Sequence, residues 1–341
     1  MDSTAAAVIR ELAAEERDEY LALMREVWGE GALSAAEFEW WLDRNPAGPA
    51  LVSVERDEEL LATAAHSLFR WHLAGEEQLV SYSLHAAVSE KARGRSLFQK
   101  LEAANEERAR AAGAAAALSF PNAASTHILS TRSGYHRFAP LRCWLRVMRP
   151  TAPLRHLLHR PGEPPALRPA SEDARAYGAV RVVPLTRFGA VTDAAYARAA
   201  AVWPNHLIRR EAHMNWRFVD SPWGYRAFAS IRDGEVNGWA VLRVKDHVGA
   251  ALAVLADLVA PPGAFAETRA LVRRCLAEVA DADAMAVLPP RDRAQRRALL
   301  SLGFLPGPLS VDFIARPLRE GVHLSHDSAD WHVALGDTDF F

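Results

Sequence analysis

The sequence predicts an α/β protein that consists of two similar units in tandem. The chain has 341 residues, whereas single hydrophobic cores rarely grow beyond about 250–300 residues. Apolar runs with the period of strands alternate with segments of helical period along the chain. A pattern in the first half also recurs in the second half. Length, alternation and recurrence together indicate two α/β domains.

The recurrence is carried by Trp, Pro, Gly and Arg-Asp at matching positions, with an apolar strand between them. All pairs are separated by 176 positions, so the match needs no gap. Two unrelated segments of helix, proline and hairpin are the alternative, but they would have to reproduce every spacing by chance. The first copy contains Trp40, Pro46, Gly48, Arg56 and Asp57, and the second contains Trp216, Pro222, Gly224, Arg232 and Asp233.

The first unit is predicted over 1–150. Ser34 is a suitable N-cap for its second helix, which ends before Pro46 because proline disfavours helical backbone at the preceding residue. An acidic turn at 57–59 lies between two apolar runs and indicates a hairpin. The predicted order is a strand and a helix over 5–29, a helix over 34–45, a hairpin over 50–75, a strand over 77–88, a helix from Ser96, a strand ending at Pro121, a helix ending at Gly134 and a closing strand over 143–150.

The remainder is predicted as a linker, a second unit and a tail. Residues 151–180 are rich in Pro and Arg, as linkers often are. The second unit is expected over 181–317, where the segment ending at Phe304 repeats the pattern around Tyr135. The tail, 318–341, looks extended.

Two clusters in the second half are interpreted as structural. Trp203-Pro204-Asn205-His206 is expected to be a loop packed on the core, and a pocket wall is the alternative. Asp337 and Asp339 are expected to be solvated carboxylates of the tail, and binding of an amine substrate is the alternative.

Composition excludes several classes of function. The net charge of −2 gives no electrostatic case for binding nucleic acid or an acidic membrane surface. Two cysteines, Cys143 and Cys275, give neither a disulfide framework nor the spacing of a metal site. No apolar run approaches the roughly 20 residues of a membrane span, and the N-terminus lacks the pattern of a signal peptide. We therefore expect a cytoplasmic protein without nucleic-acid or membrane partners; an oligomer is not predicted.

The segment Leu84–Phe98 is the strongest candidate for a binding site. An apolar strand ends at Val88, a basic turn with Lys91, Arg93 and Arg95 follows, and a helix begins near Ser96. This layout places backbone N–H groups and a helix N-terminus around a phosphate, where arginine side chains add charge and directed donors. A solvated basic turn is the alternative.

Residues 93–98, RGRSLF, resemble the pyrophosphate loop of the Gcn5-related N-acetyltransferases (GNAT), usually Arg/Gln-x-x-Gly-x-Gly/Ala. Arg93 fits the first position, whereas Ser96 and Phe98 stand where the family has small residues. The element order over 5–150 is also similar to that family. The resemblance implies two GNAT-like units, each a central mixed sheet flanked by helices. The second unit is expected to be degenerate, because no cation lies between Asp257 and Arg269 at its equivalent loop.

For function, the resemblance implies acetyl-CoA, or another acyl-CoA, as co-substrate, a small-molecule amine as acceptor, and no metal. A backbone N–H near the end of the fourth strand would hold the thioester oxygen. The residues expected to contact the co-substrate are Ala87, Val88, Arg93, Gly94, Arg95, Ser96, Leu97, Phe98 and Asn122, and capping of the following helix is the alternative role for Asn122.

His85 is the best candidate for the base that deprotonates the amine. Its ordinary pKa suits proton transfer near pH 7, and strand alternation would place it on the face of Ser83 and Ala87. A buried histidine with one hydrogen bond is the alternative, and Tyr82 and Ser81 are weaker candidates.

The family often has a tyrosine that returns a proton to the CoA thiolate, four residues before the Gly of its Gly-Phe pair. Here Ser130 stands at that position, and His127, one turn earlier, is a substitute.

Two other hypotheses compete with amine acetylation. The departures at Ser96 and Ser130 would fit a GNAT-fold enzyme with another donor, such as the aminoacyl-tRNA of related tandem peptidyltransferases, although the nearly neutral net charge argues against tRNA. The chain would otherwise be a binding or assembly protein that kept the fold and lost the chemistry.

Overall fold

The computed structural model describes residues 9–149, 173–247 and 249–339. The chain divides into two compact units, and each consists of two segments of the sequence. Unit 1 comprises Met1–Ala139 and Asp312–His326, and unit 2 comprises Pro140–Val311 and Asp327–Phe341. The linker expected over 151–180 lies outside the described residues up to position 172, and strand β8 (Arg175–Tyr177) occupies its last part.

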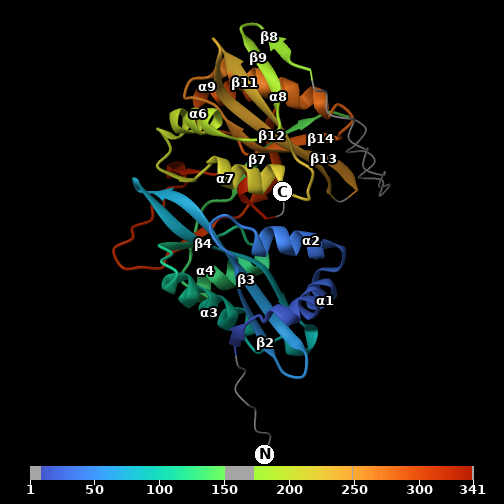
Figure 1. The fold of residues 1–341 in the computed structure, drawn as a ribbon, viewed down its shortest axis with the longest axis vertical. Helices are drawn as coiled ribbons and strands as arrows, with labels where there is room; N and C mark the ends of the chain where they lie inside the picture. The colour runs from blue at the N-terminus through green and yellow to red at the C-terminus, as the bar shows by residue number, and fades with distance from the viewer. Residues whose placement is uncertain (1–8, 150–172, 248, 340–341) are drawn as a thin grey trace, which may run out of the picture. The chain divides into compact units, whose positions relative to one another are not determined.

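Unit 1 is a mixed sheet with helices on both sides. In Figure 1, α1 and α2 lie on one side of β3 and β4, and α3 and α4 lie on the other. Its strands are β1 (Ile9–Glu11), β2 (Leu51–Arg56), β3 (Leu60–Leu73), β4 (Glu76–Val88), β5 (Ala116–Ser119), β6 (His136–Arg137) and β16 (Ile314–Pro317), and its helices are α1 (Arg17–Trp28), α2 (Ala35–Phe38), the π-helix η3 (Glu39–Asp43), α3 (Leu97–Ala111) and α4 (Ala123–Arg132).

Local sequence explains several of these boundaries. Ser34 caps α2 as predicted, and Glu37 completes the capping box, because its side chain accepts from the Ser34 backbone N–H at 2.8 Å. The acidic turn separates β2 from β3, and these strands pair antiparallel from Leu51↔His66 to Arg56↔Leu60. The strands run in the order β1-β2-β3-β4-β5-β16-β6, and within this order of described strands only β4 and β5 pair in parallel.

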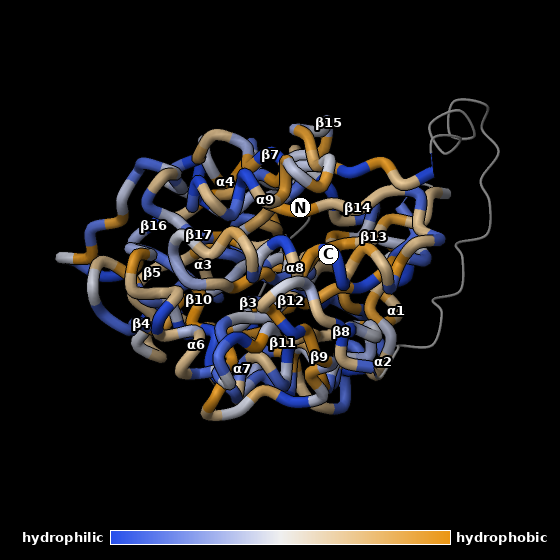
Figure 2. The backbone as a smooth tube through the Cα atoms, turned by 90° about the horizontal axis from the view of Figure 1, so that it is seen from above, coloured by the Kyte–Doolittle hydropathy of each residue, from blue (hydrophilic) through white to orange (hydrophobic). Residues whose placement is uncertain are grey.

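Unit 2 has the same kind of architecture. Its sheet runs in the order β15-β7-β14-β13-β12-β11-β9-β8, and β13 pairs with β14 in parallel. In Figure 2, β13 is mostly coloured as hydrophobic, as expected for a strand buried on both faces. The further strands are β7 (Leu141–Val147), β9 (Val180–Leu185), β10 (Asn205–Leu207), β11 (Arg226–Arg232), β12 (Glu235–His247), β13 (Ala250–Val259), β14 (Ala284–Val287), β15 (Leu305–Val311) and β17 (Trp331–His332), and the helices are α6 (Ala190–Ala200), α7 (Glu211–Met214), the π-helix η5 (Asn215–Val219), α8 (Phe265–Glu278) and α9 (Arg293–Ser301).

The internal repeat extends to an uncommon backbone feature. Both copies contain a four-residue helix that continues directly into a π-helix, first as α2 and η3 and then as α7 and η5, at the offset seen in the sequence. In each, a backbone N–H bonds to the carbonyl five residues earlier, from Arg44 to Glu39 at 3.0 Å and from Asp220 to Asn215 at 2.8 Å. Because π-helices are rare, this agreement supports a duplicated unit.

The closing strand of each unit does not follow the predicted domain boundaries. The strand expected over 143–150 to close the first unit is β7, and it pairs with β14 and β15 in the sheet of unit 2. The corresponding place in unit 1 is taken by β16, which lies between β5 and β6. The boundaries at 150 and 317 therefore differ from the observed division. A strand pattern shows that a segment needs partners but does not show which sheet provides them.

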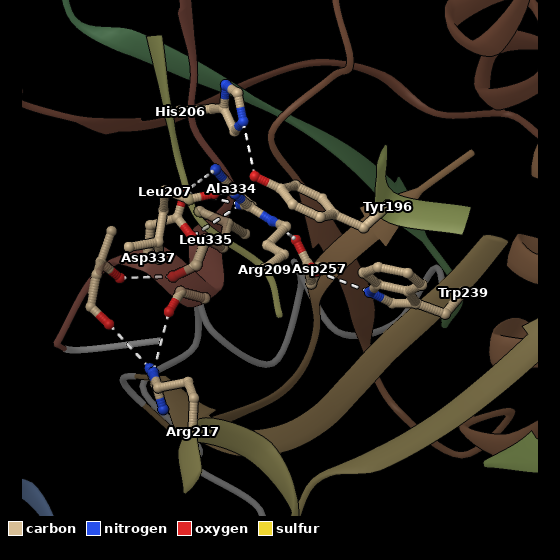
Figure 3. Close-up of polar contacts among 12 residues, drawn as sticks. Tyr196, His206, Leu207, Arg209, Arg217, Trp239, Asp257, Ala334, Leu335 and Asp337 are labelled. Carbon is tan, nitrogen blue, oxygen red and sulfur yellow. Dashed lines mark hydrogen bonds and ion pairs between the residues drawn. The ribbon is translucent and has the colours of Figure 1, made fainter. Parts of the chain in front are cut away.

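The C-terminal segment of the chain is an integral part of unit 2 (Figure 3). Arg209, whose side chain is 1 % exposed, donates from Nε to Asp257 at 2.9 Å and from Nη2 to Asp337 at 2.8 Å. Trp239 Nε1 donates to the other oxygen of Asp257 at 2.9 Å. The expectation of a solvated Asp337 is therefore wrong, because the buried charge of Arg209 requires carboxylate partners.

A second buried arginine holds the same segment through its backbone. Arg217 donates from Nε to the carbonyl of Gly336 at 3.0 Å and from Nη2 to the carbonyl of Thr338 at 2.9 Å. A side chain at Gly336 would meet the Phe218 ring at 2.7 Å, so only glycine fits there. Asp339, the last residue described, is half-buried, and burial raises the pKa of its carboxyl to about 6.

Candidate functional site

The site begins where β4 and β5 separate in unit 1. Their parallel pairing runs from Val80↔Ala116 to Tyr82↔Leu118 and ends there, although β4 continues to Val88. The Ser119 hydroxyl still bonds to the carbonyl of Ser83 at 3.0 Å. Beyond this point, β4 pairs only with β3 among the described strands. Its other edge has no strand partner there, although the Ala86 carbonyl accepts from Trp28 Nε1 at 3.0 Å.

A β-bulge in β4 places His85 at this edge. The pairs Ala65↔Leu84 and Thr63↔Ala87 leave one extra residue on β4, and His85 has φ of +48°. The expected alternation that would align His85 with Ser83 and Ala87 is wrong, because a bulge shifts which face later side chains occupy. Bulges are common beside active sites because they redirect a side chain.

The bulge also determines which backbone N–H points away from β3. The Ser89 N–H bonds to the carbonyl of Leu61 at 2.9 Å. Hydrogen-bonded and non-hydrogen-bonded pairs alternate in an antiparallel ladder, so the preceding pair, Ala62↔Val88, is non-hydrogen-bonded. Of the two predicted donors, Val88 therefore directs its N–H toward the edge without a strand partner, and Ala87 directs its N–H toward β3.

The side chain of His85 is neutral near pH 7. Burial lowers its pKa to about 4, and the Glu37 carboxylate opposes this only in part. Its ring meets the Trp41 ring edge to face at 5.9 Å. Nε2 is enclosed and has no hydrogen-bond partner among the described residues, which differs from the alternative of a histidine satisfied by one hydrogen bond. This segment of β4 therefore contains a buried ring nitrogen whose hydrogen-bonding capacity is unused.

The loop between β4 and α3 leaves its N–H groups free. Gly94 has φ of +83° and Ser96 has φ of +57°. Ser96 is the N-cap of α3, but its side chain makes no capping hydrogen bond. Within the described residues, no backbone N–H from Gly94 to Gln99 has a partner. Such a concave set of free N–H groups at a helix N-terminus is a site for an anion.

The charges around this loop also favour an anion. Arg93 is exposed and lies 3.6 Å from the exposed carboxylate of Glu90, and Arg95 has no ion pair in the described part of the chain. Lys91 pairs with Glu59 at 2.5 Å, which raises the lysine pKa. The first turn of α3 has no acidic residue. Arg93 and Arg95 are therefore able to turn toward a phosphate.

The apolar residues of the predicted site contribute their backbone only. The side chain of Leu97 is in a hydrophobic cluster under α3, and Phe98 packs beside another cluster around Ala117. Ala87 is also buried. Phe98 thus occupies the family's small-residue position without obstructing the loop, because its ring lies against the core.

The three candidate residues on or next to α4, Asn122, His127 and Ser130, differ in their hydrogen bonds and exposure. Asn122 caps the helix by accepting from the Ser125 N–H at 3.0 Å, so the structure gives it the capping role. The Ser130 hydroxyl donates to the carbonyl of Thr126 at 2.7 Å. The side chain of His127 is exposed. A proton donor on α4 remains a prediction, and the His127 side chain has no partner among the described residues.

A buried polar network beneath the site had not been predicted. His66 Nδ1 lies 2.8 Å from Ser81 Oγ, and His66 Nε2 lies 3.1 Å from a Glu102 oxygen. All three side chains are at most 1 % exposed. Farther along α3, Glu106 accepts from the Tyr135 hydroxyl at 3.0 Å. The network lies in the interior, so it positions β4 and α3 and does not contact solvent.

The equivalent loop of unit 2 cannot hold a phosphate in the same way. The N–H of Gly263, between β13 and α8, already donates to Asp292 at 3.0 Å. The first turn of α8 carries Glu267, which pairs with Arg232 at 2.8 Å. The Asp292 carboxylate thus accepts from an N–H group that a ligand would need. The Glu267 carboxylate adds negative charge nearby. The absence of cations from this loop agrees with that arrangement.

The strand, basic loop and helix N-terminus of unit 1 lie within a segment that matches a known family. Residues 8–138 match the sequence model of a family described as acetyltransferase (GNAT) domain. Unit 1 therefore contains a GNAT acetyltransferase domain, as the resemblance implied. Comparison with curated protein sequences gives no match.

Solved structures of other acyltransferases are similar over most of the chain. A conserved protein of unknown function from Enterococcus faecalis, described as a probable N-acyltransferase, is 11% identical with a TM-score of 0.60, over 92% of this chain and 73% of that one. An N-myristoyltransferase from Saccharomyces cerevisiae with bound myristoyl-CoA is 12% identical with a TM-score of 0.59, over 92% and 80%. A GCN5-related N-acetyltransferase from Kribbella flavida is 17% identical with a TM-score of 0.56, over 91% and 72%.

These likenesses confirm the predicted fold class, two mixed α/β units in tandem. The family match over residues 8–138 supports acyl transfer in general. None of the helices in the described part of the chain is long and apolar enough to span a membrane. Across the same residues, no group of three or more His, Cys, Asp or Glu side chains is arranged to hold a metal ion.

Proposed function

We propose that unit 1 transfers an acetyl group, or another acyl group, from CoA to the amine of a small molecule. The observation that carries this proposal is the set of free N–H groups from Gly94 to Gln99 beside the edge of β4 that has no strand partner. The N–H groups would bind the pyrophosphate of the co-substrate, and the edge of β4 would receive its thioester. Acyl-CoA supplies the activated acyl carbon, and the protein supplies position, a hydrogen-bond donor and a base.

The Val88 N–H is the donor that we assign to the thioester oxygen. It points away from β3, at the edge where β5 has ended. A backbone donor that is already oriented stabilises the negative charge that develops on this oxygen without reorganisation. Holding the amine and the thioester together in the opening then makes the reaction effectively intramolecular.

His85 is the group that we assign as proton acceptor. Its imidazole is neutral because burial holds its pKa near 4, so Nε2 has a lone pair throughout the neutral range. Such a weak base does not deprotonate a free alkylammonium, whose pKa is near 10. The amine therefore attacks in its neutral form. Its nitrogen becomes a much stronger acid as it bonds to the acyl carbon, His85 accepts that proton, and the C–S bond breaks to release CoA as the thiolate. Trp28, whose Nε1 bonds to the Ala86 carbonyl at 3.0 Å, borders the bulge on the acceptor side.

The first experiment is calorimetric titration of the full chain with acetyl-CoA and with longer acyl-CoAs. We expect the Arg93→Ala/Arg95→Ala variant to bind at least about tenfold more weakly, because charged hydrogen bonds to phosphate are lost. The matched control is Arg70→Ala/Arg132→Ala, which removes two exposed arginines of unit 1 that form no ion pair in the described residues. Absence of binding by the unmodified chain would refute the proposal at its first step.

The second experiment assays acyl transfer to a panel of small amines with His85→Asn. We expect a fall in kcat of about 10²–10⁴ with nearly unchanged acyl-CoA affinity, as for loss of a general base. Unchanged turnover would show that another group accepts the proton. Binding of acyl-CoA without transfer to any amine would instead favour a non-catalytic binding protein.

A further inference from the structure

Unit 2 contains two adjoining cavities that the acyl-transfer site does not use. Their volumes are about 190 and 210 Å³, and both are lined by Arg291, Trp331 and His332. They lie where the β13 and β14 strands separate, since the pairing ends at Val254↔Ala286 and β13 continues to Val259. Both are smaller than the roughly 300–1,000 Å³ of sites for drug-sized ligands, so an occupant would be small.

Asp292 and Asp330 line the second cavity, whereas three exposed arginine side chains line the first. These are Arg142 from β7, Arg291 and Arg296, and no Asp or Glu lines the first cavity. None of the three forms an ion pair within the described residues. Arg291 donates from Nε to the carbonyl of Trp331 at 2.9 Å, and Arg296 donates to the carbonyl of Arg291 at 2.8 Å, so neither guanidinium meets an anion.

This arrangement contrasts with two buried arginines of unit 2. The buried Arg209 has two carboxylate partners, and Arg274 lies 3.0 Å from Glu278. Asp327 and Asp330 lie close enough to raise the pKa of Arg291, although burial is the larger effect and lowers it. Three guanidinium groups at one cavity without a carboxylate in its lining constitute a site for an anion.

A buried imidazole contributes to the same cavities. His332 is 8 % exposed, and its ring stacks on Trp203 with the centroids 3.5 Å apart. Its Nε2 is enclosed and has no hydrogen-bond partner in the described part of the chain. Because an unsatisfied buried polar atom costs free energy, a hydrogen bond from a ligand would stabilise this position. Trp203 lines the second cavity, which agrees with the alternative that the cluster Trp203-Pro204-Asn205-His206 forms a pocket wall.

We propose that the cavity at Arg142, Arg291 and Arg296 binds a phosphate group, either as inorganic phosphate or as a small phosphate ester. Phosphate matches guanidinium groups in geometry and charge better than a single carboxylate does. The aromatic side chains next to it would contact the organic part of an ester. This inference concerns unit 2 alone and does not depend on acyl transfer by unit 1.

The experiment is calorimetric titration of the full chain with inorganic phosphate, phenyl phosphate and acetate at constant ionic strength. We expect the two phosphates to bind more tightly than acetate, and phenyl phosphate to exceed inorganic phosphate if an ester is the natural ligand. The Arg142→Ala/Arg296→Ala variant should bind phosphate about tenfold more weakly or worse. The side chains of Arg142 and Arg296 are exposed. The variant keeps the hydrogen bond from Arg291 to the Trp331 carbonyl.

Arg297→Ala is the matched control, because Arg297 is exposed on the same helix and does not line the cavity. We expect its phosphate affinity to equal that of the unmodified chain. The proposal is overturned if phosphate does not bind, if acetate binds equally well, or if the double variant and Arg297→Ala behave alike. It is also overturned if the double variant loses acetyl-CoA affinity by the same factor, because the cavity would then belong to the acyl-CoA site.

Discussion

Ser96 shows how a single residue departs from its family without abolishing the site. Its φ of +57° is a left-handed conformation in which glycine has no steric cost, whereas another residue loses about 1–2 kcal/mol. The loop therefore keeps the backbone shape of a glycine loop with a serine in place of the glycine.

We expect Ser96→Gly to raise the free energy of unfolding by about 0.5–1 kcal/mol, because the removed strain exceeds the added entropy of the unfolded chain. Ser96→Val should lower it, since β-branched residues are poorly tolerated at positive φ. Urea unfolding measures both. A Ser96→Gly variant of equal or lower stability would contradict the assigned strain, and its acyl-CoA affinity should not decrease.

His85 makes the stability of the protein depend on pH in a defined window. Its pKa is about 4 in the folded chain and near 6.5 when unfolded. Between these values the unfolded chain binds more protons, so the free energy of unfolding falls as the pH is lowered from about 6.5 to 4. His85→Asn removes this term and should flatten the dependence. Urea unfolding at several pH values tests this, and an unchanged slope would contradict it.

Sequence reasoning located the site loop but not the polar interior beside it. Arg93, Ser96 and His85 were recognisable from residue type and spacing. Arg209 carries no such signal, although Asp257 within an otherwise apolar strand indicates that a buried carboxylate requires a cation. Pairing partners far apart in sequence must be known before such a cluster can be predicted.

At the scale of elements, α3 buries a face that is half polar, with Glu102, Asn105 and Glu106 beside three apolar residues. Asn105 accepts from the Ser53 hydroxyl at 2.6 Å and donates to the carbonyl of Ala64 at 2.9 Å, so it joins α3 to both β2 and β3. These bonds fix the helix whose N-terminus forms the anion site. From the sequence alone, polar residues on an amphipathic helix indicate a solvated face, which is why this packing was missed.

We expect Asn105→Ala to lower the free energy of unfolding by about 2–4 kcal/mol, because the buried Ala64 carbonyl and the Ser53 O–H lose their Asn105 partner. Ser53 Oγ keeps the bond that it accepts from Arg108 at 2.9 Å. Glu107→Ala, an exposed position on the same helix, should change it by no more than about 0.5 kcal/mol. Thermal unfolding compares the two. Equal effects of both changes would show that α3 is held by apolar contacts alone.

The β-bulge and the closing strands could not be predicted because they depend on contacts with other strands. The hairpin, the capped α2 and the helix ending near Gly134 follow from local signals, and all appear in the structure. A bulge depends on register with the neighbouring strand, and the placement of β7 and β16 depends on the sheet that accepts them. Neither property is local to the segment concerned.

At the scale of the molecule, unit 2 depends on the last described residues of the chain. We expect Asp337→Ala to lower its unfolding free energy by about 3–5 kcal/mol, because Arg209 loses one of two carboxylate partners in a buried site. Calorimetry should show an earlier transition, whereas the control Glu235→Ala, at an exposed position, should not. If both variants melt like the unmodified chain, the tail is not part of the cooperative unit.

The position of β16 sets an order of events for the newly made chain. Ile314 pairs with Ser119, almost two hundred residues earlier, so the sheet of unit 1 stays open while unit 2 is translated. At about 5–20 residues per second the ribosome needs roughly 10–40 s for this interval. Throughout this interval, β5 has an unpaired edge next to the proposed acyl-transfer site. The unit whose synthesis begins first is therefore completed only after most of the other has been made.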